Sequence, residues 1–307
     1  MTNIYFDAKH DDRLRCQNLY DGAIYIYSPT SAGKALCEFA AEFCLQKFGC
    51  HPPTAQHEIC VEQYVEILKT LKPEFIHHPE CKRLIPRLLH ELGCDNQNTY
   101  FDVPRIRTAC AGDYLTSGLA YAFKPHRDTW YSTPMCQLNW WLPVFPIEAE
   151  NGMEFYFDYF DQPIQNSSYE FNYQDWNNMG RVQAHNQGKV DKRVQSEALE
   201  DLNLDNATRV VCEPGGLILF SAAQLHGTVA NTTDVTRISI DFRTVNRLDL
   251  NGGAENVDSE STGTTMMDYL QLSSLEHFDE ELVEEMKNKI PEPNYSTQQK
   301  LSLESHQ

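Results

Sequence analysis

The sequence changes character near Tyr100, and this change limits the chain to a few fold classes. Before it, residues 31–93 repeat apolar side chains at three- and four-residue steps, the spacing of amphipathic helices. After it come short runs rich in β-branched and aromatic residues, separated by turn sequences such as ENG and EPGG. Because many strands follow without helices between them, we expect an antiparallel barrel or sandwich. The sequence therefore predicts a mainly β protein with flanking N-terminal helices.

Particular elements can be predicted from the same patterns. The first helix is expected to end at Gly49 and the second at Pro73, and a third segment that contains Pro86 is expected to be kinked or to start late. The strand candidates are NTYFDV, SGLAYAF, CQLNWWLPVF, GMEFYFDYF, RVVCE, GGLILFS and RISIDFRTV.

We expect one domain over residues 1–290, with the β core in 100–246. The core is interrupted at 161–208 by an Asn-, Gln- and Asp-rich insertion with embedded aromatic residues, which predicts an ordered flap. An acidic amphipathic stretch predicts a C-terminal helix within 265–290, and the tail 291–307 is expected to be loose.

Composition excludes several functional classes. The chain is 41% hydrophobic and 22% charged, which is typical of a folded globular protein, and it has no run of 18 apolar residues that could cross a membrane. Its N-terminus has no apolar signal core, so we expect a cytoplasmic protein whose ten cysteines are reduced. The net charge of −19 disfavours binding to nucleic acid or to an anionic membrane.

The stretch PHRDTWYS places His126 and Asp128 two residues apart, directly after an apolar run. A second such pair, His10 and Asp12, lies in a charged N-terminal stretch, and we interpret that pair as solvated. What distinguishes the first pair is a later histidine, His226, which also follows a strand candidate. Two histidines and one carboxylate on one face of an octahedron suit non-haem ferrous iron and leave positions open for other ligands.

Two further residues complete this pattern. Arg237 follows His226 by eleven residues, and Ser239 lies on the same side of the same strand candidate. A guanidinium offers two parallel donors to a carboxylate, and the serine adds a hydroxyl donor, so the pair suits the far end of a dicarboxylate. Arg243, in DFRTV, is a rival for this role but lacks the Arg-x-Ser spacing.

This arrangement resembles the iron(II)/2-oxoglutarate-dependent oxygenases, and more narrowly the phytanoyl-CoA dioxygenase-like family. The resemblance rests on three blocks within 118–246: HRDTWYS, WWLPVFPIEAENGMEFYF and PGGLILFSAAQLHGTVANTTDVTRISIDFRTV. It implies a double-stranded β-helix (a jelly roll, cupin-like) flanked by helices. It also implies that His126, Asp128 and His226 bind Fe(II), and that Arg237 and Ser239 bind the co-substrate 2-oxoglutarate, with O2 as the oxidant.

Further residues are candidates for lining the site. Strand alternation places Gln137, Asn139 and Trp141 on one face, where the two amides could contact 2-oxoglutarate and Trp141 could line the pocket wall on the substrate side. The alternative is that Gln137 and Asn139 point outward and Trp140 packs in the core. Trp130 and Tyr131 follow the His-x-Asp motif and could line the substrate side or pack in the core. Lys124 shares the strand parity of His126 and could reach a carboxylate.

The resemblance therefore predicts a dioxygenase that hydroxylates, or else desaturates or cyclises, a small polar metabolite or natural-product intermediate, releasing succinate and CO2. The carboxylate at Asp128 favours oxygenation over halogenation, because halogenating relatives have a small residue there. The acidity of the chain favours an amine-bearing or zwitterionic substrate. The alternatives are a non-catalytic jelly-roll binding module and an oxygenase that acts on protein side chains. The oligomeric state is not predicted.

Overall fold

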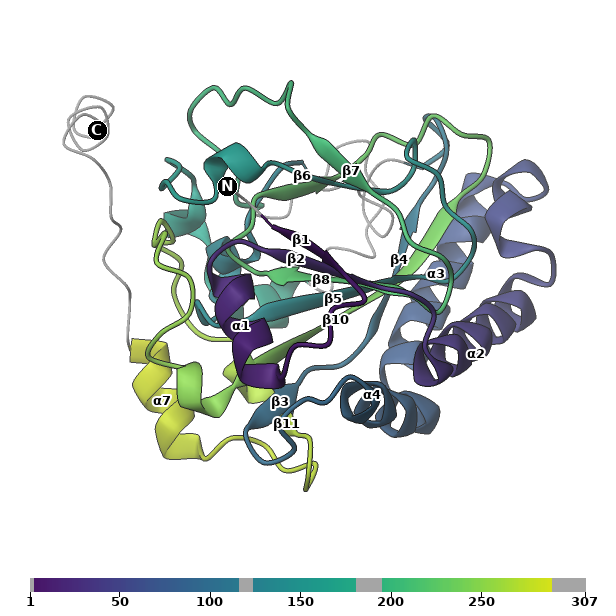
Figure 1. Cartoon of the computed structure of the whole chain (residues 1–307). Coiled ribbons are helices and arrows are strands. Elements are labelled where there is room, and N and C mark those ends of the chain that lie inside the picture. The colour runs from purple at the N-terminus through teal and green to yellow at the C-terminus, as the bar shows by residue number, and fades with distance from the viewer. Residues whose placement is uncertain (1–2, 116–123, 181–194, 289–307) are drawn as a thin grey trace.

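The computed structural model describes residues 3–115, 124–180 and 195–288, and these residues form two β-sheets with their three longest helices on one side (Figure 1). The larger sheet has, within these residues, eight strands in the order β1-β2-β8-β5-β10-β3-β11, with β4 also pairing with β10. Its strands are β1 (Ile4–Phe6), β2 (Ile24–Tyr27), β3 (Thr99–Phe101), β4 (Arg105–Ala109), β5 (Leu138–Pro143), β8 (Leu217–Ser221), β10 (Arg237–Asn246) and β11 (Leu270–Gln271). All its pairings are antiparallel except that of β1 with β2.

A smaller sheet is formed by β6 with β7 on one edge and β9 on the other. Its strands are β6 (Met153–Phe155), β7 (Thr208–Val210) and β9 (His226–Thr228). The two sheets pack against each other through an apolar layer, in which Trp141 and Phe220 of the larger sheet meet Phe155 of the smaller one. The sheets face each other as in a jelly roll without closing into a barrel, which confirms the predicted mainly β class with flanking helices.

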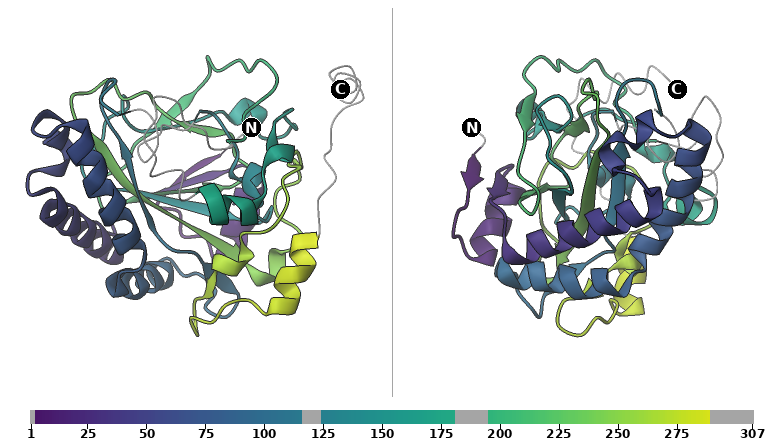
Figure 2. Two further views of the ribbon diagram at one scale, coloured as in Figure 1. Left: turned by 180° about the vertical axis from the view of Figure 1, so that it is seen from behind. Right: turned by 90° about the vertical axis from the view of Figure 1, so that its right-hand side faces the viewer.

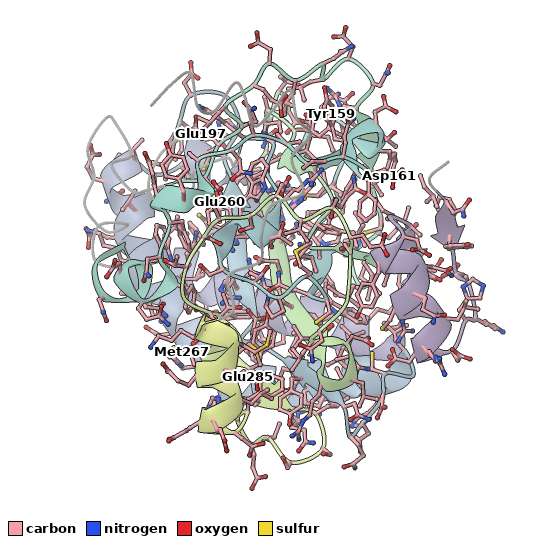
Figure 3. The ribbon with its side chains drawn as sticks, turned by 90° about the vertical axis from the view of Figure 1, so that its left-hand side faces the viewer. Tyr159, Asp161, Glu197, Glu260, Met267 and Glu285 are labelled. Carbon is pink, nitrogen blue, oxygen red and sulfur yellow. The ribbon has the colours of Figure 1, made fainter. Side chains whose placement is uncertain are left out.

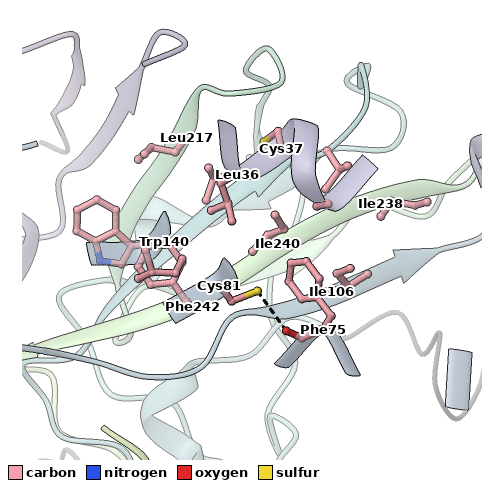
Figure 4. Packing of buried hydrophobic residues seen from close by; sticks show 14 of the residues in the cluster. Leu36, Cys37, Phe75, Cys81, Ile106, Trp140, Leu217, Ile238, Ile240 and Phe242 are labelled. Carbon is pink, nitrogen blue, oxygen red and sulfur yellow. Dashed lines mark hydrogen bonds between the residues drawn. The ribbon is translucent and has the colours of Figure 1, made fainter. Parts of the chain in front are cut away.

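The opposite face of the larger sheet is covered by three helices, which Figures 1 and 2 show together on one side. Alternation along β10 turns Ile238, Ile240 and Phe242 toward these helices, where they join Leu36, Phe75 and Trp140 in the main core (Figure 4). The odd-numbered residues of β10 therefore face the smaller sheet. The helices are α2 (Ser31–Phe48), α3 (Val61–Ile76) and α4 (Pro79–Glu91).

Two helix predictions are wrong in detail. Pro73 lies inside α3, which continues to Ile76, and α4 begins at Pro79 with Pro86 in its interior. An interior proline costs a helix about 3 kcal/mol. Here Phe75, beyond the proline, is fully buried in the main core, and its burial offsets that cost.

The C-terminal helix is also shorter than predicted. In the described residues it is α7 (Glu280–Asn288), while the chain before it forms the turn η8 (Met266–Asp268) and strand β11. Tyr269, between η8 and β11, is fully buried, so this segment is held by the core and not by a helix. The tail 291–307 lies outside the described residues.

The N-terminal stretch is structured instead of solvated. Helix α1 (Asp12–Tyr20) begins where the Asp11 carboxylate accepts a hydrogen bond from the backbone N–H of Leu14, at 2.8 Å. His10 bonds the hydroxyl of Tyr25, and Asp12 pairs with the buried Arg15. The interpretation of His10 and Asp12 as solvent-exposed charges was therefore wrong, since both take part in packing.

Three predictions fall partly or wholly outside the described residues: the strand SGLAYAF, the middle of the insertion at 181–194, and the single-domain boundary at 290. All ten cysteines are free thiols. None of the described helices combines the length and the apolar character that a membrane crossing requires.

Candidate metal centre

Three side chains from separate parts of the sequence meet between the two sheets. His226 begins β9, and its backbone exchanges two hydrogen bonds with that of His126, at 2.9 and 3.0 Å. Asp128 begins the turn η3 (Asp128–Tyr131) that follows. One ligand atom of each side chain lies within 4.8 Å of the others, and His126 Nε2 is 3.3 Å from Asp128 Oδ1. Atoms that each lie about 2 Å from one metal ion are themselves only a few ångströms apart. The close approach of these three ligand atoms therefore suits a metal ion.

Both histidines present the same ring nitrogen to the shared centre. Nδ1 of His126 donates to the carbonyl of Lys124, and Nδ1 of His226 donates to the carbonyl of Gln224, each at 2.8 Å. The backbone two residues earlier in the chain therefore selects the tautomer and leaves Nε2 as the ligand atom. Burial, together with the neighbouring His126, lowers the pKa of His226 to about 4, so this imidazole is a neutral ligand at neutral pH.

The carboxylate of Asp128 is held ionised by its surroundings. Burial acts to raise its pKa, but the nearby guanidinium of Arg243 outweighs burial and holds the pKa well below its usual range. Nη2 of Arg243 lies 3.5 Å from Asp128 Oδ2. Two imidazoles and one carboxylate are the donor set that leaves coordination positions open on ferrous iron.

Arg237 is a buried cation on the same interior face of β10. Its side chain is 5% exposed, Nη1 donates to the carbonyl of Gly152 at 3.2 Å, and the guanidinium lies 5.5 Å from the ring of Trp141. Nε has no hydrogen-bond partner, and within the described residues no carboxylate lies within ion-pair distance. Burial lowers the pKa of Arg237 to about 10, so it remains charged at neutral pH.

Ser239, two residues further along β10, adds a second unsatisfied donor. Its side chain is fully buried, and its hydroxyl has no hydrogen-bond partner among the described residues. Buried polar groups are almost always paired, so a guanidinium with an unsatisfied Nε and a hydroxyl with no partner among these residues, both on one face, indicate a place for an anion. The sheet connects this place to the metal centre: Arg237 contacts Met153 of β6, and Phe155, two residues on, pairs with His226.

The three residues predicted from CQLNWWLPVF face the interior; Asn139 and Trp141 lie in β5, and Gln137 directly precedes it. Asn139 and Trp141 pair across the sheet with Arg243 and Asp241, and Trp141 lies in the apolar layer between the sheets. The hydroxyl of Tyr269 donates to Gln137 Oε1 at 2.6 Å, and Gln137 Nε2 donates to Asn139 Oδ1 at 3.0 Å. This chain of bonds sets the orientation of both amides. The alternative in which these residues point outward is therefore wrong, while their contact with a co-substrate stays a prediction.

Two of the proposed substrate-lining residues lie elsewhere. Trp130 is fully buried in an apolar cluster with Tyr156, Ile164 and Leu225, so it packs in the core and not on an open wall. Lys124 is 64% exposed and pairs at 2.9 Å with Glu197 of the insertion, which Figure 3 labels, so it extends away from the site.

Tyr131, by contrast, does border the triad. Its ring meets that of His126 edge to face at 5.8 Å and that of Phe171 at 5.0 Å. Its hydroxyl bonds the carbonyl of Ser196, so one aromatic side chain ties both limbs of the insertion to the metal centre.

Further charged residues lie on the interior face and were not predicted. Arg107 binds both oxygens of Asp241, at 2.6 and 3.2 Å, and Arg105 pairs with Asp102. Their spacing in the sequence could have revealed them, because residues at every second position of a strand share one face. Polar residues occur at every second position in RIRTA and in the Arg-x-Ser-x-Asp-x-Arg pattern of β10. Charged residues at alternate positions of an otherwise apolar strand indicate a polar interior.

No family model matches the sequence, and no curated protein matches it. Among solved structures, the chain is similar to the non-heme monooxygenase ThoJ, with 13% identity, a TM-score of 0.36, and 71% of each chain covered. It is also similar to the epimerase SnoN in complex with Fe3+, alpha ketoglutarate and nogalamycin RO, with 13% identity, a TM-score of 0.39, and 76% of this chain and 85% of that chain covered.

A third similar structure is EvdO2 from Micromonospora carbonacea var. aurantiaca complexed with 2-oxoglutarate, with 15% identity and a TM-score of 0.35. The match covers 57% of this chain and 62% of that chain. Likenesses of this strength do not transfer an activity or a ligand. The case for function therefore rests on the geometry of the site.

Proposed function

We propose that this protein is an Fe(II)- and 2-oxoglutarate-dependent dioxygenase that oxidises a small polar molecule. The observation that carries the proposal is the combination of a His126, Asp128 and His226 triad with a buried cation, Arg237, that has no carboxylate partner within the described residues. A dicarboxylate satisfies both features, with one end on the metal and the other on the guanidinium. When bound, iron and 2-oxoglutarate supply the oxidising chemistry, with O2 consumed and succinate and CO2 released.

The residues of the chain have distinct tasks in this proposal. The carbonyls of Lys124 and Gln224 keep the Nε2 atoms of the two histidines ready to bind metal. Arg237 and Ser239 hold the far carboxylate of the co-substrate, and the ring of Trp141 packs against the guanidinium of Arg237. The buried position between two sheets excludes water from the reacting groups.

A non-catalytic binding module is the alternative from a different class. Such a module has no need for a convergent triad and a buried, unpaired cation together, because both features lower the stability of a protein that binds neither metal nor anion. Action on a protein side chain is a third possibility, and nothing in the described geometry favours it.

An anaerobic titration tests the proposal. Metal-free protein receives Fe(II) and then 2-oxoglutarate, and a weak visible charge-transfer band should develop with the second addition. His226→Ala should lose metal binding and the band together, whereas Arg237→Met should keep the metal and lose the band. The proposal fails if wild type binds Fe(II) but gives no band, or if Arg237→Met behaves as wild type.

The substrate and the outcome of the reaction require a second experiment. Hydroxylation, desaturation and ring closure use the same ligands, and the amine-bearing substrate suggested by the charge of −19 stays a prediction. A screen for succinate release over a metabolite panel, divided into cationic, zwitterionic and anionic members, tests this preference. Equal turnover of the three groups would contradict it.

A further inference from the structure

Arg243 lies at the centre of a group of three carboxylates. Its Nη1 lies 3.5 Å from Asp102 Oδ2, and its Nη2 lies 3.5 Å from both Asp128 Oδ2 and Asp241 Oδ2. The side chain is 19% exposed, so these contacts lie mostly out of water. All three contacts are long for a hydrogen bond, and one positive charge divides its attraction among three carboxylates, so the strength of each contact depends on what else that carboxylate binds.

The two flanking carboxylates have other arginines. Asp102 accepts from Arg105, and Asp241 accepts two hydrogen bonds from Arg107. Three arginines thus face three aspartates, so the group is neutral. Since Asp102 and Asp241 are paired separately, Arg243 is available to Asp128, the predicted metal ligand.

The backbone holds Arg243 in place. Its backbone N–H donates to Asp102 Oδ1 at 2.6 Å, and the backbone N–H of Asp102 donates to the carbonyl of Arg243 at 3.0 Å. Arg243 also pairs with Asn139 in the middle of the larger sheet. The guanidinium therefore starts from a fixed point on a rigid strand.

The two oxygens of Asp128 have different neighbours. Oδ1 lies 3.3 Å from His126 Nε2, on the side of the other ligand atoms, and Oδ2 lies 3.5 Å from Arg243. A carboxylate can bind a metal through one oxygen or through both. If both bind, one of the three open positions is lost, and 2-oxoglutarate and O2 together need all three.

We propose that Arg243 is a positioning residue that retains the outer oxygen of Asp128, so that the metal takes only Oδ1. The inference rests on the proposed function, since it requires a metal at the triad. It assigns Arg243 a task different from the co-substrate contact that its sequence position suggested. The consequence is a metal centre that keeps three positions open before any co-substrate arrives.

The test counts the waters on a bound metal, with Mn(II) as the probe and no co-substrate present. Paramagnetic relaxation of water protons is proportional to the number of exchanging waters on the metal. In Arg243→Met the carboxylate is free to bind through both oxygens, so the inner-sphere relaxivity should fall by about a third. Arg107→Met is the matched control, because it breaks an ion pair of the same group one carboxylate further away and should keep the wild-type value.

The outcomes are distinguishable. Wild-type relaxivity in Arg243→Met overturns the inference, and so does an equal fall in Arg107→Met, which would indicate a general loosening of the sheet. If Arg243→Met does not fold, as judged by circular dichroism, Arg243→Gln carries the same test, since its shorter neutral side chain cannot reach Asp128. Failure of the wild type to bind Mn(II), or binding that survives His226→Ala, would instead refute the proposed function itself.

Discussion

Replacing Arg237 by methionine should make the metal-free protein more stable, although the side chain is buried. Burial lowers the pKa of this guanidinium from its ordinary value to about 10. At about 1.4 kcal/mol for each pKa unit, keeping the charge costs the folded state about 3 kcal/mol. The substitution also removes the hydrogen bond to Gly152 and the contact with Trp141, at about 1 kcal/mol each. The net gain is about 1 kcal/mol, or about 2 °C in the unfolding temperature.

Thermal and urea unfolding of the metal-free wild type and Arg237→Met measure this gain directly. Arg127→Met is the matched control, because Arg127 is equally buried but is paired with Asp258 at 2.7 Å, and neither side chain is exposed. That variant removes the cation that is paired with the buried carboxylate of Asp258, and its free energy of unfolding should fall by about 3–5 kcal/mol. The two substitutions remove the same chemical group, so the opposite signs isolate the effect of the missing partner.

The reasoning would be refuted if Arg237→Met were less stable than the wild type. Such a result would mean that the charge of Arg237 is already satisfied within the folded chain. The strongest argument for an anion site between the sheets would then be lost. A stabilised variant that still binds 2-oxoglutarate on the Mn(II)-loaded protein would place the co-substrate elsewhere.

Three other predictions concern the site and the fold. The pKa of His226 is lowered to about 4 in the folded protein, so only the unfolded chain takes up this proton as the pH falls below about 6.5. The free energy of unfolding of the metal-free protein should therefore fall by about 2 kcal/mol between pH 7 and pH 5. Urea unfolding of His226→Phe should show a smaller fall over the same pH range. Asp128→Gly removes the one anionic ligand and should abolish Mn(II) binding and turnover; calorimetric binding or full turnover in that variant would show that the ligand assignment is wrong. Gly33→Ala should destabilise the protein, because the added Cβ would lie 2.1 Å from the carbonyl oxygen of Gly215. This clash should outweigh the gain in helix propensity of about 1 kcal/mol. An unchanged thermal unfolding temperature would contradict the prediction.

The fold class could be predicted from the sequence because the longer strands carry strong patterns. CQLNWWLPVF, GGLILFS and RISIDFRTV each contain enough alternating or buried residues to indicate a strand, and they become β5, β8 and β10. Strands of three residues, such as β1 and β9, carry too little pattern to be recognised. Their pairing depends on partners far away in the chain, which local sequence does not specify.

The helix ends, unlike the longer strands, could not be predicted from local sequence. Pro73 and Pro86 are local signals for a helix end, and both lie inside helices. Packing of Phe75 and the other apolar residues against the larger sheet provides more stabilisation than the prolines remove. Local propensity is therefore outweighed wherever an element buries a large apolar face.

The sequence by itself determined which side chains share a face of a strand. Arg237, Ser239 and Arg243 are separated by even numbers of residues, so covalent geometry alone places them on the same side of β10. Only the tertiary structure decided which partner each of them meets. Arg243 reaches Asp128, while no carboxylate of the residues that the structure describes lies within ion-pair distance of Arg237, since ion pairs between distant segments depend on strand order and register.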